Sequence, residues 1–241
     1  MHNRTENQMR QLDKRLMLMA SYMTPGGYGV DVGTDHGYLA VFLVQSGRAK
    51  RMLATDIRSG PLSSAQRCIR EAGLTDQIET RLTDGLNGLD LTGVTDILIA
   101  GMGGILISEI LSARLSDLSD KNLILQPMTQ SAALRSWLGA NGFAILSEKC
   151  ATVAGKSYSV IHARFTGEIH SCTPFEALVG KAREDQSPDA DTYLSALLHR
   201  EEKALRGLCM AQQPDLSEIE QLKEQISRLQ ALIHQREERK S

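Results

Sequence analysis

Short apolar runs alternate with polar turns through the first two thirds of the chain. Seven of these runs have the length and composition of β-strands, at residues 28–33, 51–57, 78–84, 96–102, 122–128, 143–153 and 157–165. Between the first five runs lie stretches with helical spacing, such as Leu62, Ala65, Ile69 and Ala72. This alternation of strand and helix predicts a parallel sheet with helices on both faces.

The last two runs are joined only by residues 154–156, which is too short for a crossover between parallel strands. These two strands are therefore expected to form an antiparallel hairpin. The resulting prediction is an α/β fold with a Rossmann-like, mostly parallel seven-stranded sheet that ends in an antiparallel C-terminal strand hairpin.

The C-terminal part has a different pattern, with leucines and isoleucines at helical spacing. One series lies between Pro188 and Pro214 and the other follows Asp215, a residue type that caps helices well; the members are Leu194, Leu198, Leu205 and Leu208, then Ile219, Leu222, Ile226, Leu229 and Ile233. They predict a small α-helical coiled-coil hairpin joined near Gln212. We therefore expect two domains, 1–165 and 166–241. A further short helix is expected over residues 9–23.

The charge balance of the chain excludes one class of nucleic-acid-binding protein. The 241 residues include 27 Lys and Arg against 29 Asp and Glu. Residues 1–165 hold 17 basic and 15 acidic side chains, a balance of +2, and residues 166–241 hold 10 and 14, a balance of −4. Such a chain does not hold nucleic acid by a large positive field. Any contact with nucleic acid has to come from local basic faces.

Targeting and metal signals are missing from the sequence. The N-terminal residues are charged where a signal peptide needs an apolar region, and no apolar run approaches the roughly 20 residues of a membrane span. The four cysteines form no CxxC pair and no spacing typical of zinc ligands. We expect a cytoplasmic protein with no membrane contact, no disulfides and no metal.

The first strand runs into the sequence DVGTDHGYL, in which Asp31, Gly33, Asp35 and Gly37 occupy every second position. A dinucleotide site would carry GxGxxG here, so that bare amide groups meet the pyrophosphate. Asp35 places a carboxylate there instead. Two carboxylates suit a cofactor with cationic groups, and S-adenosylmethionine carries a sulfonium and an ammonium.

The next strands also end in acids or glycines. Asp56 ends the second strand, Asp84 the third, and the segment AGMGG the fourth, at the edge where open α/β sheets bind ligands. The alternative is that these residues only form turns. The predicted cofactor-binding residues are Asp31, Gly33, Asp35, Gly37, Tyr38, Asp56, Ile57, Asp84, Gly85, Ala100, Gly101, Met102 and Gly103.

The motifs DVGTDHGYL, ATDI, TDGL, AGMGG, LILQP and GKSYSV, in this order, resemble the bacterial tRNA (adenine-22-N1)-methyltransferases. The resemblance spans nearly the whole chain. It implies a class I methyltransferase that uses S-adenosylmethionine to form 1-methyladenine in the D-loop region of tRNA. The chain departs from the family at Met128, where members usually carry Asn after QP, and at Gly37, where they often carry Ala. If that Asn orients the target base, a neighbour has to take its role.

For this reaction, adenine N1 already has a lone pair, so positioning is expected to supply most of the catalysis. The predicted catalytic residues are Asp35, as acceptor from the adenine amino group, and His36, as a stacking or hydrogen-bonding partner. Alternatively, Asp35 binds the cofactor amino group or caps a helix, and His36 is structural. The predicted substrate-binding residues are Arg10, Lys14, Arg15, Gln126, Pro127, Lys156 and Tyr158.

Two other hypotheses remain open at this point. A nicotinamide-dependent oxidoreductase would use the same acid after the second strand, but it would carry GxGxxG. A non-catalytic module would keep the cofactor fold and use the helical hairpin for protein partners. The Met128 departure and the acidic C-terminal part favour that second alternative.

Overall fold

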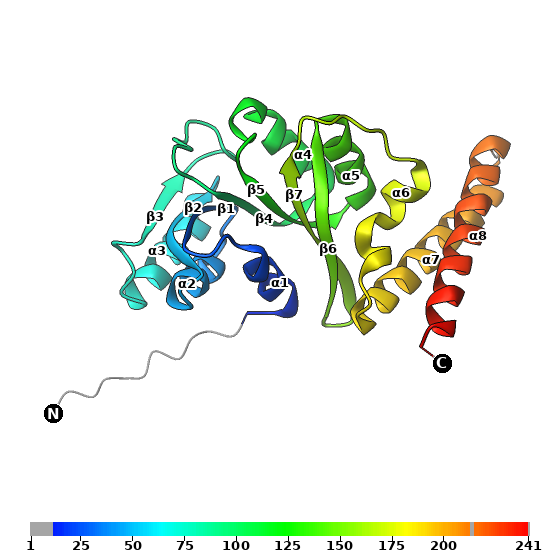
Figure 1. The fold of residues 1–241 in the computed structure, drawn as a ribbon, viewed down its shortest axis with the longest axis horizontal. Helices are drawn as coiled ribbons and strands as arrows, with labels where there is room; N and C mark the ends of the chain where they lie inside the picture. Colours follow the sequence, from blue (N-terminus) through cyan, green and yellow to red (C-terminus); the bar gives the residue numbers. More distant parts are fainter. Residues whose placement is uncertain (1–11, 213–214, 241) are drawn as a thin grey trace.

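A computed structural model describes residues 12–212 and 215–240 of the protein (Figure 1). Its seven strands form one sheet in the order β3-β2-β1-β4-β5-β7-β6. The first five strands are parallel, and β7 is antiparallel to both β5 and β6. The strands are β1 (Gly27–Val32), β2 (Ala49–Asp56), β3 (Ile78–Leu82), β4 (Asp96–Gly103), β5 (Asn122–Thr129), β6 (Phe143–Val153) and β7 (Lys156–Phe165). The predicted sheet and its antiparallel hairpin are confirmed.

Helices cover both faces of this sheet. Along β4, Ile97 and Ile99 pack with α4 and α5 in one buried cluster, whereas Leu98 packs with α1 and α2 in another. The β4 run is apolar without alternation because both of its faces are covered. The helices of this part are α1 (Lys14–Tyr22), α2 (Tyr38–Gln45), α3 (Ser59–Glu71), α4 (Gly104–Ser112), the short 3₁₀ helix η1 (Leu115–Asp117) and α5 (Ser131–Ala140).

The expected alternation of strand and helix fails once, between β3 and β4. Residues 83–95 form turns and loop instead of a helix. Gly85, Gly88 and Gly93 all have positive φ values, of 59°, 67° and 73°, which a right-handed helix cannot contain. The loop still contributes buried leucines, such as Leu86, to the core. The prediction of a helix in every interval between the first five strands was therefore wrong here.

The C-terminal part contains α6 (Pro174–Val179), the 3₁₀ helix η2 (Gly180–Glu184), α7 (Pro188–Cys209) and α8 (Leu216–Glu238). The predicted helical pair is confirmed as α7 and α8, which lie side by side at the end of the molecule opposite β3 (Figure 1). In α8, Ile226 and Leu229 of the predicted seam are buried. In α7, the chain also buries Tyr193 and Leu197, because this helix packs against both α8 and β6.

A buried arginine between the sheet and the C-terminal helices joins the two parts. Arg135 of α5 and Glu148 of β6 are almost completely buried, with Nη2 and Oε1 2.6 Å apart. Arg135 also donates to the carbonyl oxygens of Ala177 and Leu178 at 2.7 and 2.8 Å, and to the Tyr193 hydroxyl at 3.0 Å. Arg135 of α5 therefore links three other elements, β6, α6 and α7.

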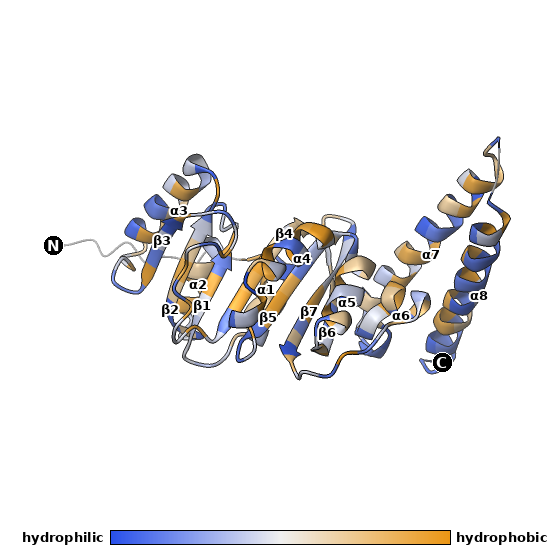
Figure 2. Ribbon diagram, turned by 90° about the horizontal axis from the view of Figure 1, so that it is seen from above, coloured by the Kyte–Doolittle hydropathy of each residue, from blue (hydrophilic) through white to orange (hydrophobic). Residues whose placement is uncertain are grey.

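Apolar residues gather along the strands in the middle of the sheet, while many of the residues of α8 are polar (Figure 2). Among the described residues, no helix combines the length and the apolar character that a membrane crossing requires.

Candidate active site

The turn after β1 is fixed to the neighbouring strand. The backbone amides of Gly33 and Thr34 both donate to the Thr55 carbonyl oxygen of β2 at 2.8 Å. Gly33 has φ 75°, and a Cβ at this position would overlap the Met102 Cε from β4. Only glycine therefore fits this position without strain.

Two buried carboxylates lie near each other at the carboxyl ends of β1 and β2. Asp31 and Asp56 are only 4% and 5% exposed. Thr34 Oγ1 donates to Asp31 Oδ2 at 2.7 Å, and the Arg58 backbone amide donates to Asp56 Oδ1 at 2.8 Å. The second oxygen of each carboxylate accepts no hydrogen bond from the described residues. Each acid therefore retains an acceptor for a ligand.

Burial changes the acidity of one of these groups. Loss of water around the carboxyl raises the pKa of Asp31 from 3.8 to about 6. The Thr34 hydrogen bond opposes this rise, and the nearby negative charge of Asp56 adds to it. A cation placed beside Asp31 would favour its charged form.

Asp35 and His36 occupy the exposed tip of the same turn. Asp35 has φ 48°, a left-handed conformation that Asp adopts more readily than most residues, and its side chain is 65% exposed. Its Oδ2 lies 3.5 Å from His36 Nε2, and the His36 ring stacks on Tyr38 with 5.2 Å between centroids. The turn thus presents a carboxylate and an imidazole to solvent above the buried acids.

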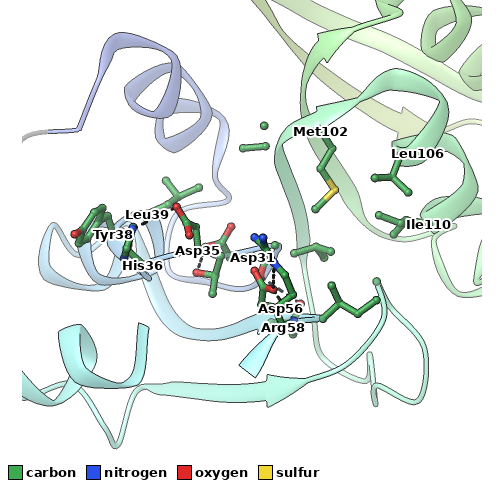
Figure 3. Close-up of a pocket in the computed structure, with 18 of the residues that line it drawn as sticks. Asp31, Asp35, His36, Tyr38, Leu39, Asp56, Arg58, Met102, Leu106 and Ile110 are labelled. Carbon is green, nitrogen blue, oxygen red and sulfur yellow. Dashed lines mark hydrogen bonds and ion pairs between the residues drawn. The ribbon is translucent and has the colours of Figure 1, made fainter. Parts of the chain in front are cut away.

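A cavity of about 700 Å³ opens at this edge of the sheet. Figure 3 shows Asp31, Asp35 and Asp56 on one side of it and Met102, Leu106 and Ile110 facing them from the other. Of the residues predicted from sequence, those that line the cavity are Arg15, Asp31, Gly33, Asp35, His36, Tyr38, Asp56, Ile57, Asp84, Gly85, Ala100, Gly101 and Met102.

The first turn of α1 closes one side of the cavity. Asp13 caps this helix by accepting from the Leu16 amide at 3.0 Å, and it pairs with Arg15 at 3.1 Å. Arg15 Nη1 also donates to Gln126 Oε1 at 2.8 Å, and the same oxygen accepts from the Gly101 amide at 3.1 Å. Arg15 therefore connects α1 to the ends of β4 and β5.

The other predicted residues lie around the cavity without lining it. Gln126 and Pro127 are buried in β5, and Gly37 packs against Ala65 of α3. The Arg15 guanidinium lies over the Tyr158 ring, with its central carbon 5.6 Å from the ring centroid. Lys14 pairs with Asp189 of α7 at 3.4 Å. Lys156 is exposed at the start of β7. Gly103 follows Met102, which lines the cavity. Arg10 lies outside the described residues.

Several residues of the cavity were missed from sequence. Leu106 and Ile110 are four residues apart on one face of α4, a spacing that also fits an ordinary core contact. Thr34 precedes Asp35 and Arg58 follows Asp56 by two residues, so their closeness in sequence to predicted acids was a usable signal. Asp13 gave no signal, because only the packing of α1 brings it to the cavity. The remaining missed residues are Leu16, Val32, Leu39, Thr55 and Thr83. The described residues contain no cluster of three or more His, Cys, Asp or Glu side chains suited to a metal.

Comparison with known proteins identifies a family to which this chain is similar in sequence. A family model described as a methyltransferase domain matches residues 12–161. The tRNA (adenine(22)-N(1))-methyltransferase of Bacillus subtilis is 38% identical over 154 residues, which are 64% of this chain and 65% of that enzyme. The sequence match thus spans slightly less than two thirds of the relative.

Solved structures extend the likeness to the C-terminal helices. The B. subtilis m1A22 tRNA methyltransferase TrmK superposes with a TM-score of 0.81 at 29% identity, over 92% of this chain and 99% of that one. Streptococcus pneumoniae Sp1610, in complex with S-adenosyl-L-methionine, gives a TM-score of 0.78 at 32% identity, over 93% and 100%. The family model spans more than half of the chain, and the chain therefore belongs to the methyltransferase domain family.

Proposed function

We propose that this protein is an S-adenosylmethionine-dependent methyltransferase that forms 1-methyladenine at adenine 22 of tRNA. The observation that carries the proposal is the pair of buried acids, each with one unpartnered oxygen, in the wall of a cavity that Met102 also lines. The family match and the likeness in sequence and in structure to the Bacillus subtilis adenine-22 tRNA methyltransferase support the reaction and the substrate.

The residues present fit this cofactor. The free oxygen of Asp31 suits its ammonium group, and the free oxygen of Asp56 suits the ribose hydroxyls. The apolar side chains of Ile57, Leu106 and Ile110 suit the faces of its adenine ring, with the Asp84-Gly85 segment at the ring edge. When bound, this cofactor supplies an electrophilic methyl group.

The chain contributes positioning to the reaction. The adenine N1 lone pair forms the new carbon–nitrogen bond as the methyl–sulfur bond breaks, sulfur takes that electron pair, and the positive charge passes to the adenine ring. Asp35 then accepts a hydrogen bond from the exocyclic amino group, which becomes more acidic as the ring gains charge. Its 65% exposed side chain is free to meet a base that has left its stack. His36 offers a ring on which the base can stack.

The tRNA backbone meets a few local cations under this proposal. Arg15, Lys14 and Lys156 lie along the same edge of the molecule, and Tyr158 supports Arg15. Arg15 is largely engaged by Asp13 and Gln126, so it acts first as a positioning residue. Few phosphate contacts imply a shallow dependence of tRNA affinity on salt.

The proposal extends to organisation and location. Residues 1–165 serve as the cofactor-binding domain and residues 166–241 as a helical domain, joined through the hydrogen bonds of Arg135 to Ala177, Leu178 and Tyr193. Under this proposal the enzyme works in the cytoplasm.

One experiment tests the reaction directly. The purified protein is incubated with methyl-labelled S-adenosylmethionine and an unmodified tRNA transcript, and the nucleosides are separated after digestion. We expect labelled 1-methyladenosine with the natural transcript and none when adenine 22 is replaced by guanine. Label in another nucleoside, or equal labelling of both transcripts, would refute the assignment. Tight binding of NAD without binding of S-adenosylmethionine would favour an oxidoreductase.

A further inference from the structure

Gln130 lies beside the cavity although it does not line it. It follows β5 and precedes α5, and β5 is the hydrogen-bonded neighbour of β4. A Cβ placed on Gly103, the residue after Met102, would lie 3.4 Å from Gln130 Oε1. The exposed Gln130 amide is therefore held at the rim, one residue from the cavity wall.

Local conformational preferences do not explain a glutamine at this position. Gln130 has φ 57°, in the left-handed region that favours glycine. It stands at the N-cap of α5, where Ser, Thr, Asn and Asp are the preferred residues, and it makes no capping hydrogen bond. Its amide has no hydrogen-bond partner among the described residues. Residues that break several local rules together are concentrated at functional sites.

The surroundings of Gln130 are apolar and open. Ile105 and Leu106 at the start of α4 are 45% and 48% exposed, and Leu106 also lines the cavity. Met128, two residues before Gln130, is 41% exposed, and its sulfur accepts hydrogen bonds from Arg15 and Gln126. An apolar rim with one unused amide matches an unstacked purine, which needs a surface for its faces and a polar partner for its edge.

We propose that the Gln130 carboxamide recognises the target adenine through its N6 and N7 edge, an inference that rests on the proposed function. Gln130 Oε1 accepts a hydrogen from the N6 amino group, and Nε2 donates to N7. Glutamine and asparagine pair with adenine in this bidentate way in other nucleic-acid complexes. The pairing leaves N1 free for the methyl group.

Gln130 and Asp35 are placed so that both can accept a hydrogen bond from the same adenine amino group. The strands that precede them, β5 and β1, are the two neighbours of β4, so the two side chains flank the end of β4 from opposite sides. The N6 amino group has two hydrogens, one for each acceptor. Both bonds strengthen as positive charge spreads into the ring, so both favour the transition state over the bound substrate.

The test uses Gln130→Gly, which removes the amide and suits the left-handed backbone. Ala154→Gly is the matched control, because Ala154 has φ 49° in the exposed turn between β6 and β7. We expect Gln130→Gly to lower kcat/KM for tRNA about 10- to 100-fold, with unchanged S-adenosylmethionine affinity and no loss of thermal stability. Ala154→Gly should keep the wild-type kcat/KM.

A modified substrate separates recognition from a structural role. A tRNA with 7-deazaadenosine at position 22 lacks N7, so the wild-type kcat/KM should fall while that of Gln130→Gly stays where it was. An equal loss in both enzymes, or a Gln130→Gly enzyme as active as wild type on natural tRNA, would overturn the inference. A wild-type enzyme that makes no 1-methyladenosine would overturn the proposed function and the inference with it.

Discussion

Replacing Asp31 by Asn should make the cofactor-free protein more stable while it destroys cofactor binding. Asn has nearly the same shape, and its carbonyl oxygen can still accept the hydrogen bond from Thr34. The substitution removes the charge and puts an amide nitrogen in place of the second oxygen, which has no hydrogen-bond partner among the described residues. At about 1.36 kcal/mol for each pKa unit, the rise from 3.8 to about 6 means that ionising Asp31 costs the folded protein about 3 kcal/mol at neutral pH.

The sign of the effect follows from the direction of the pKa change. A carboxyl whose pKa is raised by folding contributes stability below its unfolded pKa of 3.8, and that contribution is lost as pH rises through about 6. Asp31→Asn should therefore exceed wild type by up to about 3 kcal/mol at pH 7.5, or roughly 6 to 12 °C in Tm for a chain of this size. The advantage should shrink to about 0.5 kcal/mol near pH 4 and vanish about one pH unit lower.

Urea unfolding at pH 7.5, 6 and 4.5 measures this difference, and calorimetry measures S-adenosylmethionine affinity. Wild-type affinity should fall roughly tenfold per pH unit below about pH 6 as Asp31 takes up a proton. Asp35→Asn is the control, because the same change in an exposed side chain should alter stability by less than about 0.5 kcal/mol. A destabilised Asp31→Asn, or an advantage that does not depend on pH, would refute the reasoning, and so would retained cofactor affinity.

Three further changes probe other parts of the molecule. Asp35→Ala should lower kcat in the tRNA assay far more than it weakens cofactor binding; the reverse pattern would make Asp35 a cofactor ligand. Gly33→Ala should weaken S-adenosylmethionine binding by more than about tenfold in calorimetry, because its Cβ overlaps Met102 Cε and strains a φ of 75°; unchanged affinity would contradict this geometry. Glu148→Gln leaves Arg135 charged and buried, so urea unfolding should show a loss of about 3 to 5 kcal/mol, and a loss below about 1 kcal/mol would argue against a structural role for the pair.

Local patterns in the sequence predicted most of the architecture. The seven strands were placed within a few residues because alternation and apolar runs are properties of neighbouring residues. The helix expected between β3 and β4 does not form, and the three glycines with positive φ that prevent it were visible in the sequence. Helix α6 was missed because its six residues are too few to show a period. The capping box from Thr173 to Glu176 was the available signal.

The composition of the candidate site was also largely readable, because the ends of parallel strands meet at one edge of a sheet. Asp31, Asp56 and the segment from Ala100 to Met102 were found in this way and all line the cavity. The tertiary structure decided what those residues are able to do. It left one oxygen unpartnered on each buried acid and brought Arg15 to Gln126, 111 residues away in sequence. It also held Gln130 in a left-handed conformation at the rim. The apolar patterns that predict strands and helices are properties of neighbouring residues, whereas burial, charge and access depend on packing between segments far apart in the chain.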